Sequence, residues 1–222
     1  DNKGKITVYI PAYRNDILHP IDIIEDVVIS YGFNNFVPQL PALATIGSSH
    51  EIERTSSKFR QLLIGFGCQE IIRTILTNQK DLFDRMNVEH EKVVELENPV
   101  SEDYNCLRNW LLPSLMKVLS VNKHVEYPQN VFEIGDVVVF DENAETMTRN
   151  VRKVAGVMAH SKANYTELKS LVESLLKQLG VKYVLRQSTL NHMIDGRQAH
   201  IIVNEKEIGY LGEVNPVVIE NF

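Results

Sequence analysis

The stretch NVFEIGDVVVF, residues 130 to 140, is dominated by β-branched and aromatic side chains and predicts a β-strand. RKVAGVMAH, at residues 152 to 160, predicts another strand. Further strands are expected at residues 5–10, 69–76, 92–99, 182–188, 198–204 and 207–213, and a short polar NEK turn joins the last two. Because strands occur as neighbours, without strict alternation with helices, the sequence predicts an α+β fold with a mostly antiparallel sheet packed against helices.

The clearest predicted helix covers residues 164 to 179. Asn164 can cap its start and Glu167 can complete a capping box. One apolar stripe, which we expect to belong to the core, contains Tyr165, Leu168, Leu171, Val172, Leu175, Leu176 and Leu179. Shorter helices are predicted at residues 79–86 and 113–123.

Another helix is expected before residue 66. Ser48 and Glu51 have capping-box spacing at its start, and glycines 65 and 67 can end it. Its apolar face contains Ile52, Phe59, Leu62, Leu63 and Phe66. That is more apolar surface than an edge helix needs, so we expect a partner, or a second copy of the chain, to cover this face.

The N-terminal part of the chain reads as a separate segment. Pro20 suits the first position of a helix that Gly32 ends, and a proline-containing stretch without periodicity follows. We place a domain boundary near residue 45, which gives segments 1–45 and 46–222. The abrupt start and the ending VVIENF lead us to expect a piece of a longer protein.

Composition narrows the class of protein. Hydrophobic residues make up 44% and charged residues 23% of the 222-residue chain, an ordinary globular mixture. A formal net charge of -6 argues against a surface built mainly for nucleic acid. The two cysteines have no zinc-site spacing, and we find no signal peptide and no apolar run of membrane-spanning length. We therefore expect a cytoplasmic protein with no membrane partner.

Spacing alone reveals no convincing active site. The close glycine pairs at 65–67 and 209–212 match neither a dinucleotide-binding nor a phosphate-binding loop, and no serine has a nucleophile-elbow context. The histidines are isolated from one another. DGR, at residues 195 to 197, predicts a turn that leads into a strand.

An acidic cluster near the N-terminus is the exception. Asp22, Glu25 and Asp26 share one face of the first predicted helix, and Asp16 precedes it by a few residues. Carboxylate oxygens are ligands for hard divalent cations. The alternative is a solvated helix start, because carboxylates in the first turn also suit the helix dipole.

Longer blocks of sequence identify a family. Residues 8–36, VYIPAYRNDILHPIDIIEDVVISYGFNNF, resemble the end of the B5 module of the phenylalanyl-tRNA synthetase β-subunit family, archaeal or eukaryotic type. ELENPVSEDYNCLRNWLLPSLMKVLSVN, VFEIGDVV, DGRQAHI and IGYLGEVNPVVIENF resemble the catalytic-like core of that subunit, in the same order. These blocks cover most of the chain.

The resemblance implies a class II synthetase-like core, an antiparallel sheet flanked by helices, after a small winged-helix-like B5 segment. It implies that the α subunit binds ATP and performs catalysis. Arg108, in LRNWLLP, would be a remnant of an ATP-binding arginine, whereas no glycine-rich stretch ending in arginine is present. The helix over residues 50–66 would pack against the α subunit and help to build an (αβ)2 heterotetramer that acts on tRNA(Phe).

The resemblance also assigns the acidic cluster. It implies a magnesium ion shared with the α subunit and held by Asp16, Asp22, Glu25 and Asp26. Asp26 departs from the commoner glutamate, which shortens the reach of that ligand.

We therefore expect a β-subunit fragment of phenylalanine–tRNA ligase that acts as scaffold and interface. The complete enzyme would join ATP, L-phenylalanine and tRNA(Phe). The alternative is a stand-alone nucleic-acid-binding protein with a degenerate synthetase-like core. Tight, salt-dependent DNA binding by the chain alone would favour that alternative.

Overall fold

The computed structural model describes residues 4–43 and 46–222, and the chain divides into two compact units, residues 1–48 and 49–222. We call them unit 1 and unit 2 and describe each separately. In the described ranges, no helix combines the length and the apolar character that crossing a membrane requires.

Unit 1 contains the helix α1 (Pro20–Tyr31) and a 3-10 turn, η1 (Phe33–Asn35). Gly32 ends α1 as predicted: its φ is 96°, and its N–H donates to the Val28 carbonyl at 2.9 Å. No residue of α1 is buried. The strand predicted at residues 5–10 is wrong, because residues 6–10 form no strand and the described part of unit 1 offers them no neighbouring strand to pair with.

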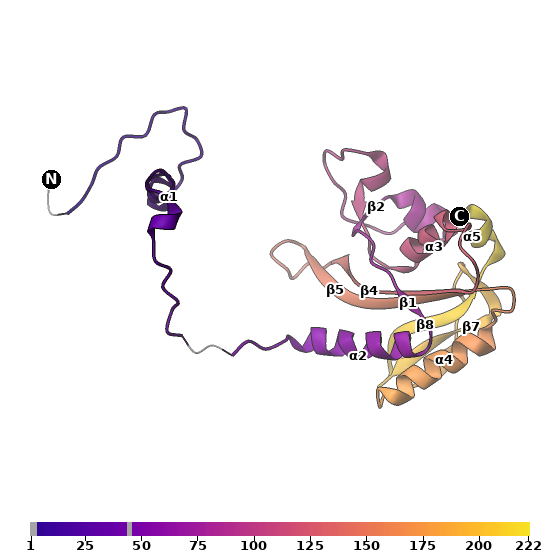
Figure 1. Cartoon of the computed structure of the whole chain (residues 1–222). Coiled ribbons are helices and arrows are strands. Elements are labelled where there is room, and N and C mark those ends of the chain that lie inside the picture. Colours follow the sequence, from indigo (N-terminus) through magenta and orange to yellow (C-terminus); the bar gives the residue numbers. More distant parts are fainter. Residues whose placement is uncertain (1–3, 44–45) are drawn as a thin grey trace. The chain divides into compact units, whose positions relative to one another are not determined.

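Unit 2 is a mixture of helices and small sheets, so the predicted α+β class is confirmed (Figure 1). Its helices are α2 (Glu51–Gly65), the π-helix η2 (Lys80–Asp84), the 3-10 turn η3 (Glu102–Tyr104), α3 (Leu112–Val121), α4 (Tyr165–Gln178) and α5 (Pro216–Asn221). Its strands are β1 (Gln69–Glu70), β2 (Leu76–Thr77), β3 (Cys106–Leu107), β4 (Gln129–Phe140), β5 (Thr148–Ala159), β6 (Val184–Gln187), β7 (Met193–Val203) and β8 (Lys206–Val214).

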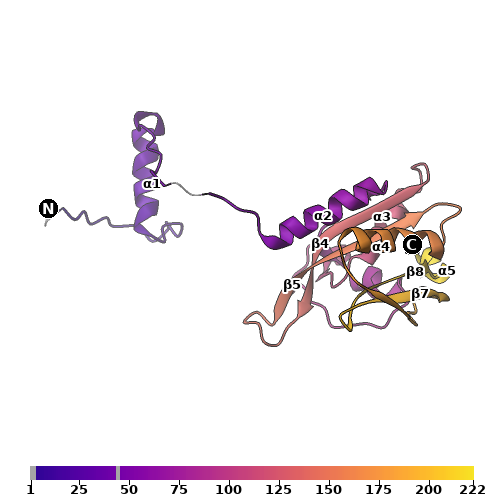
Figure 2. The same ribbon diagram turned by 90° about the horizontal axis from the view of Figure 1, so that it is seen from below.

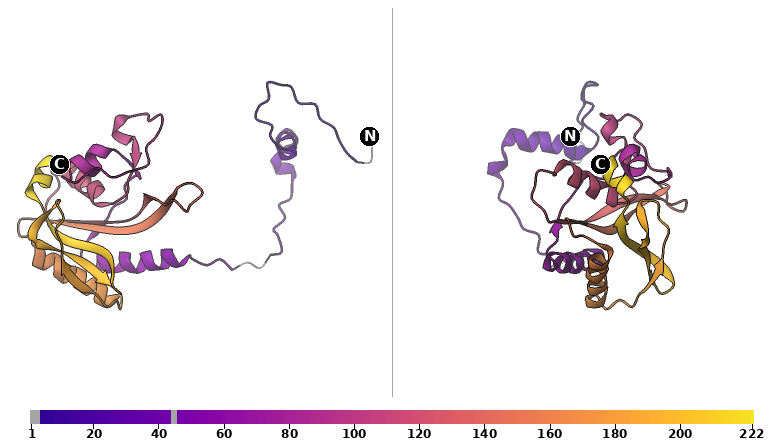
Figure 3. Two further views of the ribbon diagram at one scale, coloured as in Figure 1. Left: turned by 180° about the vertical axis from the view of Figure 1, so that it is seen from behind. Right: turned by 90° about the vertical axis from the view of Figure 1, so that its right-hand side faces the viewer.

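The sheets are β1-β4-β5, β2-β3 and β6-β7-β8. All these pairings are antiparallel except the parallel pair β1-β4. β4 and β5 pair from Gln129 opposite Ala159 to Phe140 opposite Thr148, and their hairpin projects past the helices (Figure 3). Between β7 and β8, Asn204 and Glu205 have φ values of 48° and 64°, as a tight hairpin turn requires.

β4 separates two helical layers. Phe132 and Ile134 pack on one face against Leu63 of α2 and Leu175 of α4. On the other face, α3 contributes Leu112 and Met116 to a cluster that also holds Met193, Val218 and, from β5, Val157. Figures 1 and 2 accordingly show α2 and α4 on one side of the β4-β5 ribbon and α3 and α5 on the other.

The predicted stripe of α4 is confirmed as core. Asn164 Oδ1 accepts a hydrogen bond from the Glu167 N–H at 3.0 Å and so caps the helix. The stripe divides between two clusters: Leu171, Leu175 and Leu179 face α2 and β4, whereas Tyr165, Leu168, Val172 and Leu176 face the β6-β7-β8 sheet. One helix thus connects both larger sheets.

No partner or second copy of the chain is needed to explain the apolar face of α2. Phe59, Leu62, Leu63 and Phe66 all belong to one cluster within unit 2, together with Phe132. Self-association through these side chains therefore loses its basis. The predicted capping box is also wrong, because α2 begins at Glu51 after His50, and no side chain caps it.

Two predicted strands are much shorter than expected. The stretch 69–76 yields only β1 and the start of β2, because the chain leaves the sheet after the Ile71 N–H donates to the Phe132 carbonyl at 2.8 Å. Residues 92–99 form only an isolated bridge at Glu95, because their partner, β3, is two residues long. The helix predicted at 79–86 is present as η2.

The turn predicted at residues 195–197 is wrong, because these residues lie inside β7. Gly196 has a φ of 72°, and the register between β7 and β8 shifts between Met193 and Gln198. The glycine therefore serves a β-bulge rather than a turn.

His192 is a buried histidine, 5% exposed, with its ring between those of Trp110 and Tyr210 at centroid distances of 5.3 and 5.2 Å. Neither of its ring nitrogens has a hydrogen-bond partner among the described residues. Burial lowers the pKa of His192 to about 4.

We expect this histidine to make unfolding pH-dependent. The unfolded chain takes up the proton near pH 6.5 and the folded chain only near pH 4, so stability is complete above about pH 6.5 and falls as the pH drops. The loss should reach about 2 kcal/mol at pH 5, and about 3 kcal/mol only below pH 4. Urea unfolding between pH 7 and about 5 should show it, above the range in which carboxylates protonate.

His192→Phe keeps an aromatic ring and should flatten this dependence. His124→Gln, at an exposed position, should leave it unchanged. Equal slopes for the parent and His192→Phe would contradict the assignment.

Candidate functional site

Asp22 of the acidic cluster is bonded to the backbone at the start of α1. Its Oδ2 accepts hydrogen bonds from the backbone N–H groups of His19 at 2.7 Å and Leu18 at 2.8 Å. His19 Nδ1 in turn accepts from the Ile21 N–H at 3.2 Å. The two residues therefore cap α1 reciprocally, and the backbone donors lower the pKa of Asp22. One predicted metal ligand therefore also caps the start of α1.

Asp16 and Asp26 share one arginine, Arg14. The Arg14 guanidinium bonds both oxygens of Asp16, with an Nη2–Oδ2 distance of 2.8 Å, and reaches Asp26 Oδ2 at 2.8 Å. The hydrogen bonds from Arg14 lower the pKa of Asp16, and both carboxylates raise the pKa of Arg14. A positive charge from the chain itself therefore lies between two of the four predicted ligands.

Glu25 is exposed, and no hydrogen bond of its side chain is found in the described residues. Within residues 4–43 and 46–222, no group of three or more His, Cys, Asp or Glu side chains is arranged to hold a metal ion. The structure joins Asp16 and Asp26 through Arg14, whereas Asp22 is bonded to backbone N–H groups at the start of α1. The magnesium site stays a prediction.

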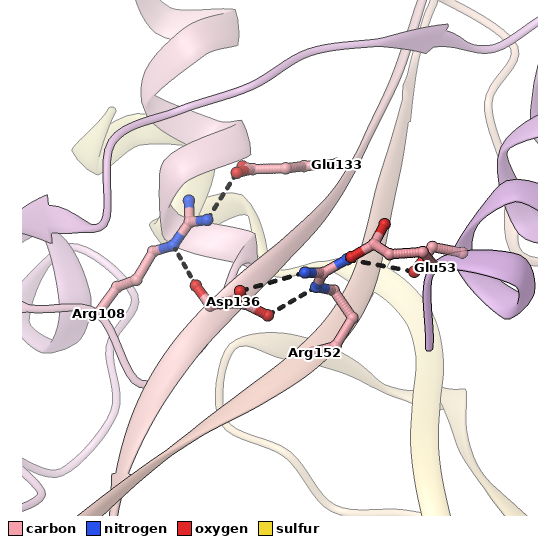
Figure 4. A network of polar contacts seen from close by, with 6 residues as sticks. Glu53, Arg108, Glu133, Asp136 and Arg152 are labelled. Carbon is pink, nitrogen blue, oxygen red and sulfur yellow. Dashed lines mark hydrogen bonds and ion pairs between the residues drawn. The ribbon is translucent and has the colours of Figure 1, made fainter. Parts of the chain in front are cut away.

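Arg108, expected as a remnant of an ATP-binding arginine, lies in the core of unit 2 at 2% exposure. Its Nη2 donates to Glu133 Oε1 at 2.6 Å, and its Nε donates to the Asp136 carbonyl at 3.2 Å (Figure 4). Glu133 is itself only 1% exposed. The guanidinium is thus enclosed by β4 and faces a carboxylate rather than a solvent-filled site.

A second ion-pair group holds β4 from its other face. Arg152 of β5 donates to the Asp136 carboxylate, with an Nε–Oδ1 distance of 2.6 Å, and to Glu53 Oε1 of α2 at 3.0 Å (Figure 4). It also reaches the buried Ser56 hydroxyl at 3.3 Å. The hydrogen bonds from Arg152 lower the pKa of Asp136. This group fixes α2 to the β4-β5 hairpin.

The buried pair is incompletely satisfied. Arg108 Nη1 and Glu133 Oε2 have no hydrogen-bond partner in the described residues, while the Arg73 N–H adds a bond to Glu133 Oε1 at 3.3 Å. Burying two charges costs free energy, and their attraction offsets that cost only when the geometry is good. The pair therefore fixes the position of the Arg108 segment against β4 more than it raises the free energy of unfolding. Its role here is structural.

Sequence reasoning missed several of these partners. Arg14 stands two residues before Asp16, and this spacing was a readable signal for an ion pair. The pairing of Glu133 with Arg108 had no such signal, because 25 residues separate them. Asp136 joins the two groups because its backbone carbonyl accepts from Arg108 while its carboxylate accepts from Arg152.

Gly135 is required by this packing. A Cβ at this position would lie 2.5 Å from Arg108 Nη2 and 2.9 Å from Glu133 Oε1. We expect Gly135→Ala to lower the free energy of unfolding by about 1–3 kcal/mol, because the buried pair has to shift.

Gly156→Ala on β5 is the matched control. Its Cβ would meet nothing closer than the Val131 carbonyl at 3.5 Å, so urea unfolding should show little or no loss. If both alanine variants lose the same stability, strand glycines in general, rather than the Arg108 contact, explain the effect.

Two family models match the chain. The model of the phenylalanyl tRNA synthetase beta chain CLM domain matches residues 37–222, and that of the tRNA synthetase B5 domain matches residues 1–33. The B5 match covers most of the first block of resemblance found in the sequence, and the CLM match contains all the later blocks.

Curated relatives agree with the family models. The chain is 44% identical to the phenylalanine–tRNA ligase beta subunit of Thermococcus sibiricus over 218 residues, which cover 98% of this chain and 39% of that protein. It is 45% identical to the beta subunit of Methanocaldococcus jannaschii over 219 residues, 99% of this chain and 40% of the relative. The beta subunit of Pyrococcus abyssi is 43% identical, with 99% and 39% covered.

The chain spans about two fifths of the length of these relatives. The predicted family is confirmed by a match over most of the sequence. The chain belongs to the phenylalanyl-tRNA synthetase beta chain family.

Proposed function

We propose that this chain serves as a scaffold and interface within a phenylalanine–tRNA ligase, which joins L-phenylalanine to tRNA(Phe) at the expense of ATP. The observation that carries the proposal is the 44% identity over 98% of the chain with a relative of that name. Residues 1–45 would be the C-terminal part of a B5-like module with its linker. Residues 46–222 would be a class II synthetase-like core without catalytic activity.

The α subunit would bind ATP and perform the chemistry in an (αβ)2 heterotetramer with tRNA(Phe). The enclosure of Arg108 supports this division, because a guanidinium already paired with Glu133 is not free to bind a nucleotide phosphate. A cytoplasmic location accompanies the proposal, since protein synthesis uses aminoacyl-tRNA there.

The chain alone should not activate phenylalanine. We expect phenylalanine-dependent pyrophosphate exchange at background without the α subunit. Co-expression with α should yield a complex whose mass, measured by native mass spectrometry, contains both chains.

Robust exchange by the chain alone would overturn the non-catalytic role. If α does not co-purify and the chain binds DNA tightly with a steep salt dependence, the stand-alone nucleic-acid-binding alternative holds instead.

We also propose magnesium as a cofactor of unit 1, shared with the α subunit, with Asp16, Asp22, Glu25 and Asp26 as its ligands. Carboxylate oxygens fit magnesium in their chemistry. Arg14 holds Asp16 and Asp26, so an ion has to compete with the guanidinium for these two oxygens. The ion would supply the positive charge that lets carboxylates gather where two subunits meet.

This competition makes the proposal testable on the chain itself. We expect millimolar magnesium to shift the backbone amide resonances of residues 14–26 weakly in the parent. Arg14→Gln should strengthen the response, because it frees two carboxylates. The double variant Asp22→Asn with Glu25→Gln should abolish it.

Asp195→Asn removes an exposed carboxylate elsewhere and should change nothing. If neither the parent nor Arg14→Gln responds to magnesium, the cluster is only a solvated helix start neutralised by Arg14.

A further inference from the structure

A small polar cavity lies in unit 2, and one of its lining residues, Arg73, also donates its backbone N–H to Glu133 of the buried ion pair. Its volume is about 110 Å³, and we call it the Arg73–Lys117 cavity. Its polar lining consists of Arg73, Thr74, Thr77, Asn78, Asp81, Asp103, Tyr104, Ser114 and Lys117, and Leu76 and Pro113 complete it. A volume of this size holds one small ionic group rather than a whole nucleotide or an aromatic amino acid.

The charges in the cavity favour an anion. Asp81, 7% exposed, is neutralised by Arg85 at 3.0 Å and Lys117 at 3.4 Å. Arg73 is half-buried and forms no ion pair within the described ranges. After internal pairing, the lining therefore retains the charge of the half-buried Arg73, while the remaining carboxylate, Asp103, is exposed.

The neutral donors around Arg73 suit the same kind of ligand. Pro113 and Ser114 lie in the first turn of α3, but this turn offers the cavity no free backbone donor, because Pro113 has no N–H and the Ser114 N–H donates to the Leu111 carbonyl at 3.0 Å. Thr77 and Ser114, which both carry hydroxyl groups, also line the cavity. Asn78 Nδ2 donates to the Asp103 carbonyl at 3.1 Å and holds that loop beside the cavity. Hydroxyl groups and a guanidinium are both suited to phosphate oxygens.

We propose that the Arg73–Lys117 cavity binds a phosphate group. Arg73 contributes the main charge, Lys117 contributes a second donor that it shares with Asp81, and the Thr77 and Ser114 side chains supply neutral donors. Tyr104, 45% exposed, also borders the cavity, so a base attached to the phosphate has an aromatic ring on which to stack.

Titration of the whole 222-residue chain with inorganic phosphate, at constant ionic strength, tests the proposal. Saturable shifts of the Thr77 and Ser114 amide resonances are expected. Arg73→Gln should weaken binding about tenfold, because a charge-assisted hydrogen bond is lost. Asp103→Asn should strengthen binding, because it removes the nearest unpaired negative charge.

Lys58→Gln removes one exposed positive charge from α2 and is the matched control, with binding expected to equal that of the parent. Absence of saturable shifts in the folded parent, equal affinity of Arg73→Gln and Lys58→Gln, or weaker binding by Asp103→Asn would each overturn the proposal.

Adenosine monophosphate distinguishes the possible source of the phosphate. If it binds more tightly than inorganic phosphate, and Tyr104→Ala removes only that gain, the phosphate belongs to a nucleotide. If inorganic phosphate binds as tightly or more tightly, the cavity takes the free anion. Both results support phosphate binding, whereas binding of the nucleotide that Arg73→Gln leaves unchanged would contradict it.

Discussion

The ion pair between Arg108 and Glu133 is the constraint on which the arrangement of unit 2 depends. Both side chains are almost fully buried, and their charges are separated by only 2.6 Å. Such a pair is tolerated only when both partners are in place, because removal of one leaves an unpaired charge in the core. The segment after β3 and the strand β4 must therefore meet in one register.

Backbone hydrogen bonds around the pair extend this fixed alignment to the neighbouring segments. The Arg108 N–H donates to the Ile75 carbonyl at 3.0 Å, and the Arg108 carbonyl accepts from Val138 at 2.9 Å. Gly135 leaves room for the guanidinium against the strand. On the opposite face, Arg152 connects Asp136 to α2. A single strand is thus held by charge on both faces, and apolar helices pack around it.

The charged side chains of unit 1 differ from the buried pair of unit 2 in their exposure to water. Asp16, Asp26 and Arg14 remain partly in water, where ion pairs contribute little to stability. Arg14 instead places a positive charge among carboxylates that would otherwise repel one another. The two sets of ion pairs therefore differ in what they can do, since buried charges fix a structure and exposed ones can exchange partners.

Local patterns in the sequence determined the family, the α+β class and the longest elements. The β-branched run of β4 and the seven-residue stripe of α4 predict their own structure because neighbouring residues alone create the apolar face. The acidic cluster could likewise be located, since its members are close in the chain. Only the tertiary structure decided the features that depend on residues far apart in the chain. These are the loss of the predicted strands at 5–10 and 92–99, the bulge at Gly196, and the pairing of Arg108 with Glu133. Strand pairing and buried charge depend on partners that only the folded chain brings into contact, and no local pattern records them.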